Sequence, residues 1–192
     1  MHLYRPCLYQ WHWHETATAG STGLIGGEVL RLGLKNGHEI TTVGRRPTGM
    51  ASHEIVSSFD DLPRLPPADI AICALGTTIL QAGTKAAFRA IDEGTVVSFA
   101  TAAKAAGVDH FLVVTAVGAN PDASVFYSRV KGQTEGQLMT MGFKRLDIIR
   151  PGLLLGDRRE HRRIEALLQH IAPATDLLMR GKWRRYKSVQ AA

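Results

Sequence analysis

Apolar residues follow two different spacings along the chain, and the spacing marks the expected elements. Over residues 23–35 they recur at helical intervals, and Asn36-Gly37 follows as a helix stop. Short apolar or β-branched runs bounded by turn residues predict strands instead. The predicted strands are residues 38–43, 54–56, 69–75, 110–115 and 145–149.

Two further helices are predicted between these strands, at residues 84–106 with a break near Gly94 and at residues 124–141. Strands that alternate with helices indicate βαβ crossovers and therefore a parallel sheet. We predict an α/β fold: a doubly wound, Rossmann-like, mostly parallel sheet with helices on both faces, in three α/β/α layers. Residues 15–192 are expected to form a single domain, preceded by a poorly defined segment, residues 1–14.

Residues 15–19 occupy the place of the first parallel strand, but they are small or polar. A central parallel strand is covered on both faces and normally carries a continuous Val, Ile and Leu run. We therefore expect this first strand to be weak.

A glycine-rich turn follows, in which three glycines recur at three-residue intervals. It reads Gly20-Ser21-Thr22-Gly23-Leu24-Ile25-Gly26. Glycines let the backbone come close to a pyrophosphate, and the free N–H groups of the next helix attract an anion. The motif predicts a dinucleotide site, and the alternative is an ordinary glycine loop.

Two more segments end predicted strands on the same edge of the sheet, where ligands of such folds bind. One is Arg45-Arg46, and the other is Leu75-Gly76-Thr77-Thr78. The acidic residue that holds a ribose hydroxyl in NAD enzymes is missing, and guanidinium groups suit a 2′-phosphate. This favours NADP over NAD as cofactor; the alternative is that the arginines lie in a solvated turn.

Tyr127 and Lys131 are four residues apart on a predicted helix, so they share one helix face. A lysine ammonium favours phenolate and lowers the pKa of a nearby tyrosine, which would suit the tyrosine to acid–base chemistry. Thr115 ends the preceding strand, and its hydroxyl could hydrogen-bond a substrate oxygen.

Composition places the chain among ordinary globular proteins, with 192 residues and 45% hydrophobic content. No apolar run is long enough to span a membrane, and the N-terminal residues lack a secretory signal pattern, so we expect a cytoplasmic protein. The net charge of +6 concentrates in residues 158–163 and 180–187. A solvated basic surface is favoured there over a nucleic-acid or acidic-membrane patch.

Histidine and cysteine add little chemistry. His12 and His14 form the one close histidine pair, without further ligands at metal spacing, so no metal site is expected. The two cysteines, Cys7 and Cys73, suggest no disulfide framework, and Cys73 lies in an apolar run typical of a core strand.

Taken in order, the segments GSTGLIG, VGRRP, CALGTTILQAGTKAAFRAID, HFLVVTAVGANPDASVFYSRVKGQTE and LDIIRPGLLLGDR resemble the atypical short-chain dehydrogenase/reductases. The resemblance is to the NAD(P)H-binding branch of Tat-interacting-protein-like oxidoreductases. It implies that Thr115, Tyr127 and Lys131 are catalytic, with Lys131 also holding the nicotinamide ribose. It also places Gly76, Thr77 and Pro151 near the cofactor.

The chain departs from the family pattern at both ends, because residues 1–16 differ from the family's first strand and the family usually continues into a further helix after Ala192. Truncation at the C-terminus is therefore an expectation. The resemblance implies an NADP-dependent oxidoreductase that acts on a small carbonyl or alcohol substrate, and it leaves a homodimer open. The alternative function is an NADPH-binding regulatory or scaffold protein without turnover.

Overall fold

The computed structural model describes residues 15–51, 53–152, 154–155 and 189–190. Its centre is a six-stranded sheet in which every neighbouring pair of strands is parallel. The strand order is β3-β2-β1-β4-β5-β6, which is the order of dinucleotide-binding doubly wound folds. The predicted fold class is confirmed.

The elements follow the predicted order along the chain. The strands of the sheet are β1 (Glu15–Ala19), β2 (Glu39–Gly44), β3 (His53–Val56), β4 (Ile70–Cys73), β5 (His110–Val114) and β6 (Arg145–Ile149). The helices are α1 (Leu24–Lys35), α2 (Ile79–Ala82), α3 (Lys85–Arg89), the π-helical turn η1 (Ala90–Thr95), α4 (Val96–Ala105) and α5 (Phe126–Thr140). A two-stranded parallel pair joins β7 (Leu154–Leu155) to β8 (Val189–Gln190).

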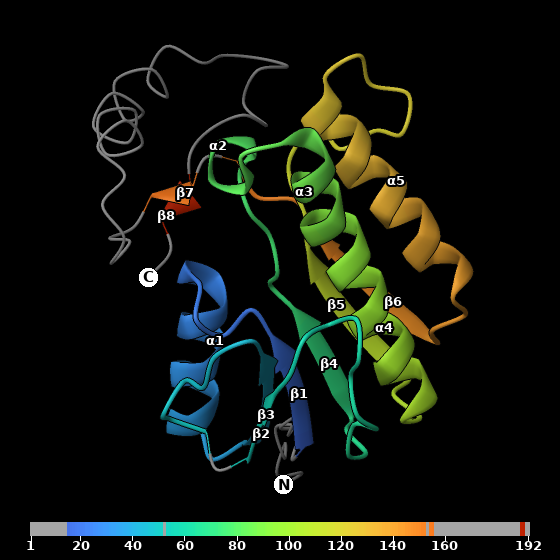
Figure 1. Ribbon diagram of the computed structural model, residues 1–192. Coiled ribbons are helices and arrows are strands. Elements are labelled where there is room, and N and C mark those ends of the chain that lie inside the picture. The colour runs from blue at the N-terminus through green and yellow to red at the C-terminus, as the bar shows by residue number, and fades with distance from the viewer. Residues whose placement is uncertain (1–14, 52, 153, 156–188, 191–192) are drawn as a thin grey trace, which may run out of the picture.

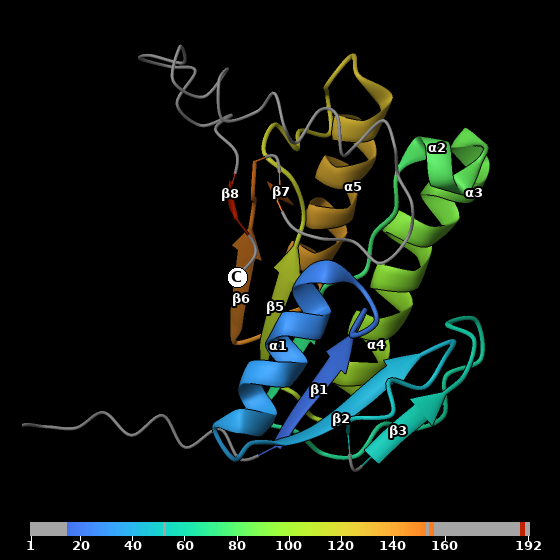
Figure 2. The same cartoon turned by 90° about the vertical axis from the view of Figure 1, so that its left-hand side faces the viewer.

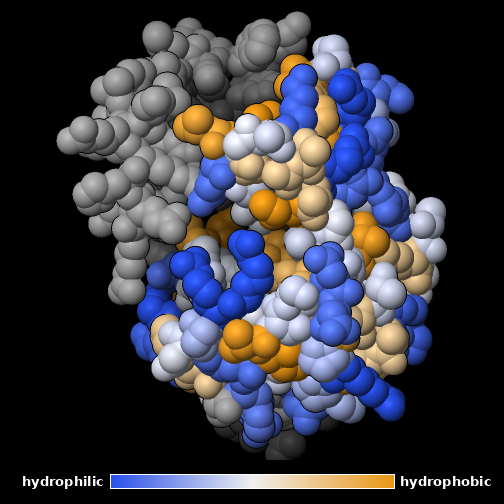
Figure 3. All heavy atoms as spheres, viewed as in Figure 1, coloured by the Kyte–Doolittle hydropathy of each residue, from blue (hydrophilic) through white to orange (hydrophobic). Residues whose placement is uncertain are grey.

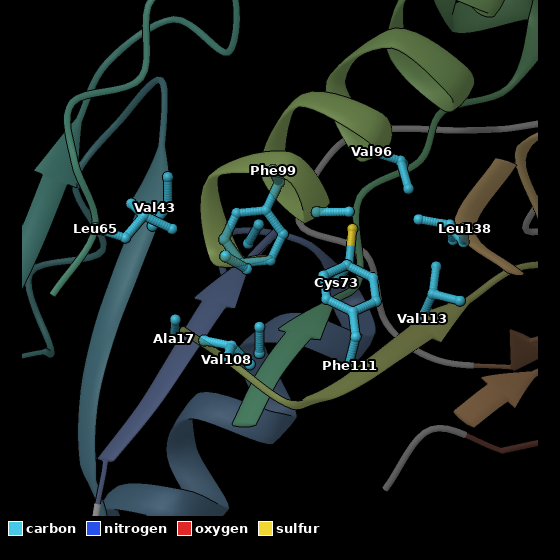
Figure 4. Packing of buried hydrophobic residues seen from close by; sticks show 14 of the residues in the cluster. Ala17, Val43, Leu65, Cys73, Val96, Phe99, Val108, Phe111, Val113 and Leu138 are labelled. Atoms are coloured by element: carbon cyan, nitrogen blue, oxygen red, sulfur yellow. The ribbon is translucent and has the colours of Figure 1, made fainter. Parts of the chain in front are cut away.

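Helices cover both faces of the sheet, so the three-layer arrangement is confirmed (Figure 1). Helix α1 lies on one face, and α4 and α5 lie together on the other, as the rotated view in Figure 2 also shows. A buried hydrophobic cluster fills the space between the sheet and the α4–α5 layer (Figure 4). Phe99 of α4 and Phe111 of β5 belong to this cluster and are fully buried.

Strand β1 is an inner strand of the sheet, although its residues are small or polar. That this strand is weakly held stays a prediction. Strand β1 pairs with β2 on one side and β4 on the other, and its residues after Glu15 are buried. Ala17 and Ala19 belong to the same cluster as Phe99. Small side chains on β1 leave room for the aromatic rings of that cluster, so tertiary packing supplies the apolar contact that β1 itself lacks.

The break near Gly94 is confirmed, and it takes the form of a wide π-helical turn between α3 and α4. Helix α2 was not predicted; it is a short turn that Thr78 caps by accepting a hydrogen bond from the N–H of Gln81. π-Helical turns such as η1 often mark functional sites. Among the helices of the described residues, none has the length and apolar character needed to cross a membrane.

Candidate functional site

The glycine turn connects β1 to α1 in a shape that requires glycine at two positions. Gly20 has a positive φ of 89°, and a Cβ there would lie 2.5 Å from the carbonyl oxygen of Ala74, directly after the adjacent strand β4. A Cβ at Gly26 would lie 2.2 Å from the carbonyl oxygen of Gly20. The turn therefore packs tightly against β4, and no side chain caps the N-terminus of α1. A free helix N-terminus beside a bare backbone fits a phosphate group.

Beside this turn lies a hollow of about 80 Å³. It gathers the glycine turn, the end of β2 and the end of β4, which the sequence places far apart. Its lining residues are Gly20, Ser21, Thr22, Thr42, Val43, Gly44, Arg45, Arg46, Thr48, Phe59 and Leu75. Arg45 and Arg46 are exposed at its rim, and no acidic side chain lines it among the described residues. Figure 3 shows hydrophilic and hydrophobic residues side by side on the face seen in Figure 1.

The loop that carries Arg45 and Arg46 is held by Glu54 of β3. One carboxylate oxygen, Oε1, accepts hydrogen bonds from the N–H of Thr48, the hydroxyl of Thr48 and the N–H of Gly49. These bonds lower the pKa of Glu54, chiefly through the Thr48 hydroxyl. Glu54 therefore fixes the backbone that follows the two arginines.

Among the predicted residues of the glycine turn, Ser21 and Thr22 line the hollow, whereas Leu24 and Ile25 do not. Ser21 is buried, and its hydroxyl lies 2.9 Å from that of Thr18, so it joins β1 to the turn. Thr22 is exposed and lines the hollow. Leu24 and Ile25 begin α1 and are half-buried.

Gly76 and Thr77 lie in a second cluster, and in sequence they directly follow Leu75, which lines the hollow. The centre of this cluster is Asp92 of η1, a fully buried carboxylate. Its Oδ2 accepts a 2.8 Å hydrogen bond from the N–H of Thr77, and its Oδ1 lies 2.5 Å from Nζ of Lys131. Burial raises the pKa of Asp92, while the charge of Lys131 opposes that rise. A buried acid and base therefore meet at the loop that follows β4.

Tyr127 stands one turn before Lys131 on α5, as predicted. Nζ of Lys131 lies 6.0 Å from the centre of the Tyr127 ring, and the fully buried Phe88 packs its ring 5.4 Å from that of Tyr127. The tyrosine is half-buried, whereas Lys131 is only 5% exposed. The shared helix face of this pair is confirmed, and the catalytic role of the pair stays a prediction.

Thr115 has a partner that the sequence did not reveal. Its buried hydroxyl donates a 2.6 Å hydrogen bond to Oε1 of Glu135, and Glu135 in turn accepts two hydrogen bonds from the Arg150 guanidinium. The side-chain proton of Thr115 is therefore directed at a carboxylate rather than at a substrate oxygen. Next to Arg150, the carbonyl of Pro151 accepts a hydrogen bond from the N–H of Val117. Pro151 thus ties the end of β6 to the loop after β5.

Asp92 and Glu135 are the site residues that sequence analysis missed. The helical spacing of the sequence could have indicated that both carboxylates are buried. Asp92 stands four residues after the buried Phe88 and four before the buried Val96, and Glu135 stands four residues after Lys131. An acid on the buried stripe of a helix needs a partner, because a buried unpaired charge is unstable.

Other expected features lie partly outside the described residues. His12, His14, Cys7 and the basic segments at 158–163 and 180–187 all fall there. Cys73 is confirmed as a core residue, and burial raises the pKa of its thiol to about 12, which makes it unreactive.

Comparison with known sequences identifies close relatives, although no protein-family model matches the chain. The chain is 35% identical over 173 residues to the mitochondrial protein fmp52 of Aspergillus niger, covering 82% of this chain and 74% of that protein. It is 34% identical over 155 residues to HTATIP2 of Rattus norvegicus, covering 74% of this chain and 64% of that protein.

Solved structures resemble the fold at lower sequence identity. Human SDR39U1 with NADPH matches with a TM-score of 0.60 and 21% identity, over 83% of this chain and 60% of that one. A putative NAD-dependent epimerase/dehydratase from Bacillus halodurans matches with a TM-score of 0.63 and 18% identity, over 91% of both chains. MoeE5, solved with UDP-glucose and NAD, matches with a TM-score of 0.67 and 14% identity, over 83% of this chain and 60% of that one.

The fungal relatives also correct one expectation. The absence of a secretory signal pattern predicted a cytoplasmic protein, but relatives from Aspergillus and Scheffersomyces are named as mitochondrial proteins. The prediction was wrong because a missing secretory signal excludes one destination without selecting among the others. The sequence identity and coverage of the fungal relatives show that the chain belongs to the FMP52 family.

Proposed function

We propose that the chain is an NADP-dependent oxidoreductase of the short-chain dehydrogenase/reductase type. The observation that carries the proposal is the hollow where the glycine turn meets Arg45 and Arg46 without a lining carboxylate. An anionic 2′-phosphate would gain charge-assisted hydrogen bonds there, whereas a ribose hydroxyl would find no acid to hold it. NAD and NADPH both occur in the similar solved structures, so the preference for NADP rests on the two arginines.

The proposed reaction is reduction of a small carbonyl compound to an alcohol, or the reverse. NADPH held at this site would supply the hydride that a carbonyl carbon accepts. Tyr127 gives its phenolic proton to the carbonyl oxygen, so the product is the neutral alcohol. Lys131 favours the phenolate that remains and binds the nicotinamide ribose.

A cofactor-binding regulatory protein without turnover is the second candidate. The hydrogen bond from Thr115 to Glu135 favours it, because that bond occupies the proton which would otherwise hold a substrate oxygen. In this alternative, Lys131 still contacts the cofactor, while Tyr127 moves no proton.

The experiment that tests the proposal has two stages. Fluorescence titration of the purified chain with NADPH and NADH measures cofactor choice, and tighter binding of NADPH is expected. NADPH oxidation is then followed with a panel of aldehydes and ketones. Tyr127→Phe should retain NADPH binding and lose turnover by about 10²–10⁴-fold, as is usual for a general acid. A substrate that Tyr127→Phe reduces at the unaltered rate would refute the catalytic role of Tyr127.

We also propose a mitochondrial location, on the basis of the names of the fungal relatives. Subcellular fractionation with an antibody against the chain tests this directly. Enrichment with a mitochondrial matrix or membrane marker is expected, and a chain absent from the mitochondrial fraction would contradict the proposal.

A further inference from the structure

We propose that Asp92 is a positioning residue of the cofactor site, which holds Lys131 and the backbone of Thr77 at a fixed separation. The inference rests on the proposed binding of NADPH and concerns a residue to which the family resemblance assigned no role. It is carried by the two contacts of a single buried carboxylate.

Each oxygen of Asp92 has a different partner. Oδ1 lies 2.5 Å from Nζ of Lys131, and Oδ2 accepts the N–H of Thr77 at 2.8 Å. The Asp92 side chain has no exposed surface, so bulk water does not compete for its two oxygens. One rigid, planar group therefore joins α5 to the loop after β4.

The neighbouring Gly76 packs closely against this ion pair. A Cβ on Gly76 would lie 3.3 Å from Oδ1 of Asp92, which is tighter than most Cβ contacts, and 3.4 Å from Nζ of Lys131, which is about the limit of ordinary contact. Gly76 therefore lets the loop backbone pass directly over the ion pair. The loop and Lys131 can then approach one ligand from adjacent sides.

Asparagine cannot replace Asp92 in this role. A carboxylate presents two acceptor oxygens, whereas the asparagine amide presents one acceptor and one donor group. Either the Lys131 ammonium or the Thr77 N–H would then face another donor. The substitution Asp92→Asn should release one of the two elements without changing the size of the side chain.

Asp92 and its neighbour in the π-helical turn, Glu93, make separate contacts. The adjacent Glu93 forms its contacts with Arg89 and with the Gln137 side chain, outside the cluster. The backbone carbonyl of Asp92 also accepts a hydrogen bond from the hydroxyl of Thr134 on α5. Glu93→Gln is therefore a matched control, because it removes a carboxylate from the same turn without touching Lys131.

The two halves of NADPH should respond differently. The adenosine half would lie at the hollow lined by Arg45 and Arg46, and the nicotinamide half would lie at Lys131 and the Gly76-Thr77 backbone. The fragment 2′,5′-ADP contains only the adenosine half. It therefore reports on the hollow and is indifferent to the position of Lys131.

The test measures the affinities of NADPH and 2′,5′-ADP by calorimetric titration for the unaltered chain, Asp92→Asn and Glu93→Gln. Asp92→Asn should weaken NADPH binding by about tenfold or more, the usual effect of a lost charge-assisted contact, with fragment binding unchanged. Glu93→Gln should change neither affinity. If Asp92→Asn weakened the binding of both ligands equally, the inference would be overturned, because a merely structural residue affects both halves alike. Unchanged NADPH binding would overturn it as well, because Lys131 would then not need Asp92.

A second measurement does not depend on the variant folding. In the unaltered chain, the Thr77 N–H should be protected from hydrogen exchange by NMR, because a buried carboxylate accepts it. Rapid exchange of that proton would overturn the positioning role of Asp92 while leaving the proposed function standing. An unaltered chain that binds 2′,5′-ADP but not NADPH would also overturn it, and one that binds neither ligand would overturn the proposed function as well.

Discussion

The Thr115 hydroxyl donates a 2.6 Å hydrogen bond to Glu135, so the end of β5 is tied to a buried carboxylate on α5. Arg150, just after β6, binds the same carboxylate through two nitrogens. Three elements therefore meet at Glu135 beside the expected catalytic residues. Thr115 therefore has a structural role, because its hydroxyl joins β5 to α5 through Glu135.

Thr115→Val should lower the free energy of unfolding by about 1–3 kcal/mol, because it removes one donor from a buried carboxylate. Urea denaturation measures this change. Thr101→Val is the matched control. Within the described part of the chain, its exposed hydroxyl bonds only to the carbonyl of Val97 in α4, so a change within about 0.5 kcal/mol is expected. Equal effects of the two substitutions would show that the bond to Glu135 adds no stability.

The double substitution Arg45→Ala, Arg46→Ala should remove most of the preference for NADPH over NADH. Each lost charge-assisted contact typically costs about 1.5–3 kcal/mol, so NADPH affinity should fall by about tenfold or more while NADH affinity stays nearly constant. Fluorescence titration with both cofactors measures the ratio. Arg64→Ala, an exposed arginine outside the hollow, is the control. A preference that survives the double substitution would place the 2′-phosphate elsewhere.

Gly26→Ala and Gly136→Ala should have opposite effects on stability, although both positions are helical. A Cβ at Gly26 would overlap the carbonyl of Gly20, whereas a Cβ at Gly136 would meet nothing within 4 Å. Gly26→Ala should destabilise the fold by about 1–3 kcal/mol or more through overpacking. Gly136→Ala should stabilise α5 by about 0.5–1 kcal/mol. Thermal unfolding compares the two, and a harmless Gly26→Ala would mean that the turn is looser than described.

Asp147 should contribute to stability at neutral pH and lose that contribution in acid. His110 and Arg145 hold the pKa of Asp147 below its ordinary value of 3.8, mainly through the hydrogen bond to His110. Because the folded-state pKa is lowered, the contribution is complete above that ordinary value and disappears as pH falls through the lowered one.

The matching variant is Asp147→Asn. It should be less stable than the unaltered chain by about 0.5–1 kcal/mol at neutral pH, since the carboxylate is partly exposed, and the difference should vanish in strong acid. Urea denaturation across a pH series measures this, with the exposed Asp60→Asn as control. A difference that persists unchanged in strong acid would assign the effect to packing rather than to charge.

The sequence by itself determined the order of the elements and the position of the glycine turn. Helical and strand spacing are local properties. The helix at residues 24–35 and the strand at 110–114 could therefore be predicted from their own residues alone. The positive φ of Gly20 and the close approach of Gly26 are likewise consequences of one short motif. The meeting of Arg45 with that motif followed from topology, because parallel strands end at the same edge of the sheet.

Only the tertiary structure decided which buried charges are paired. Asp92 and Lys131, or Glu135 and Arg150, lie on separate elements, and their contacts depend on how α5 packs against the rest of the chain. The same holds for β1, whose small residues become a buried central strand because neighbouring strands and α4 cover them. Local patterns record the preferences of a segment for helix or strand, whereas burial and charge pairing arise from segments that meet only after folding.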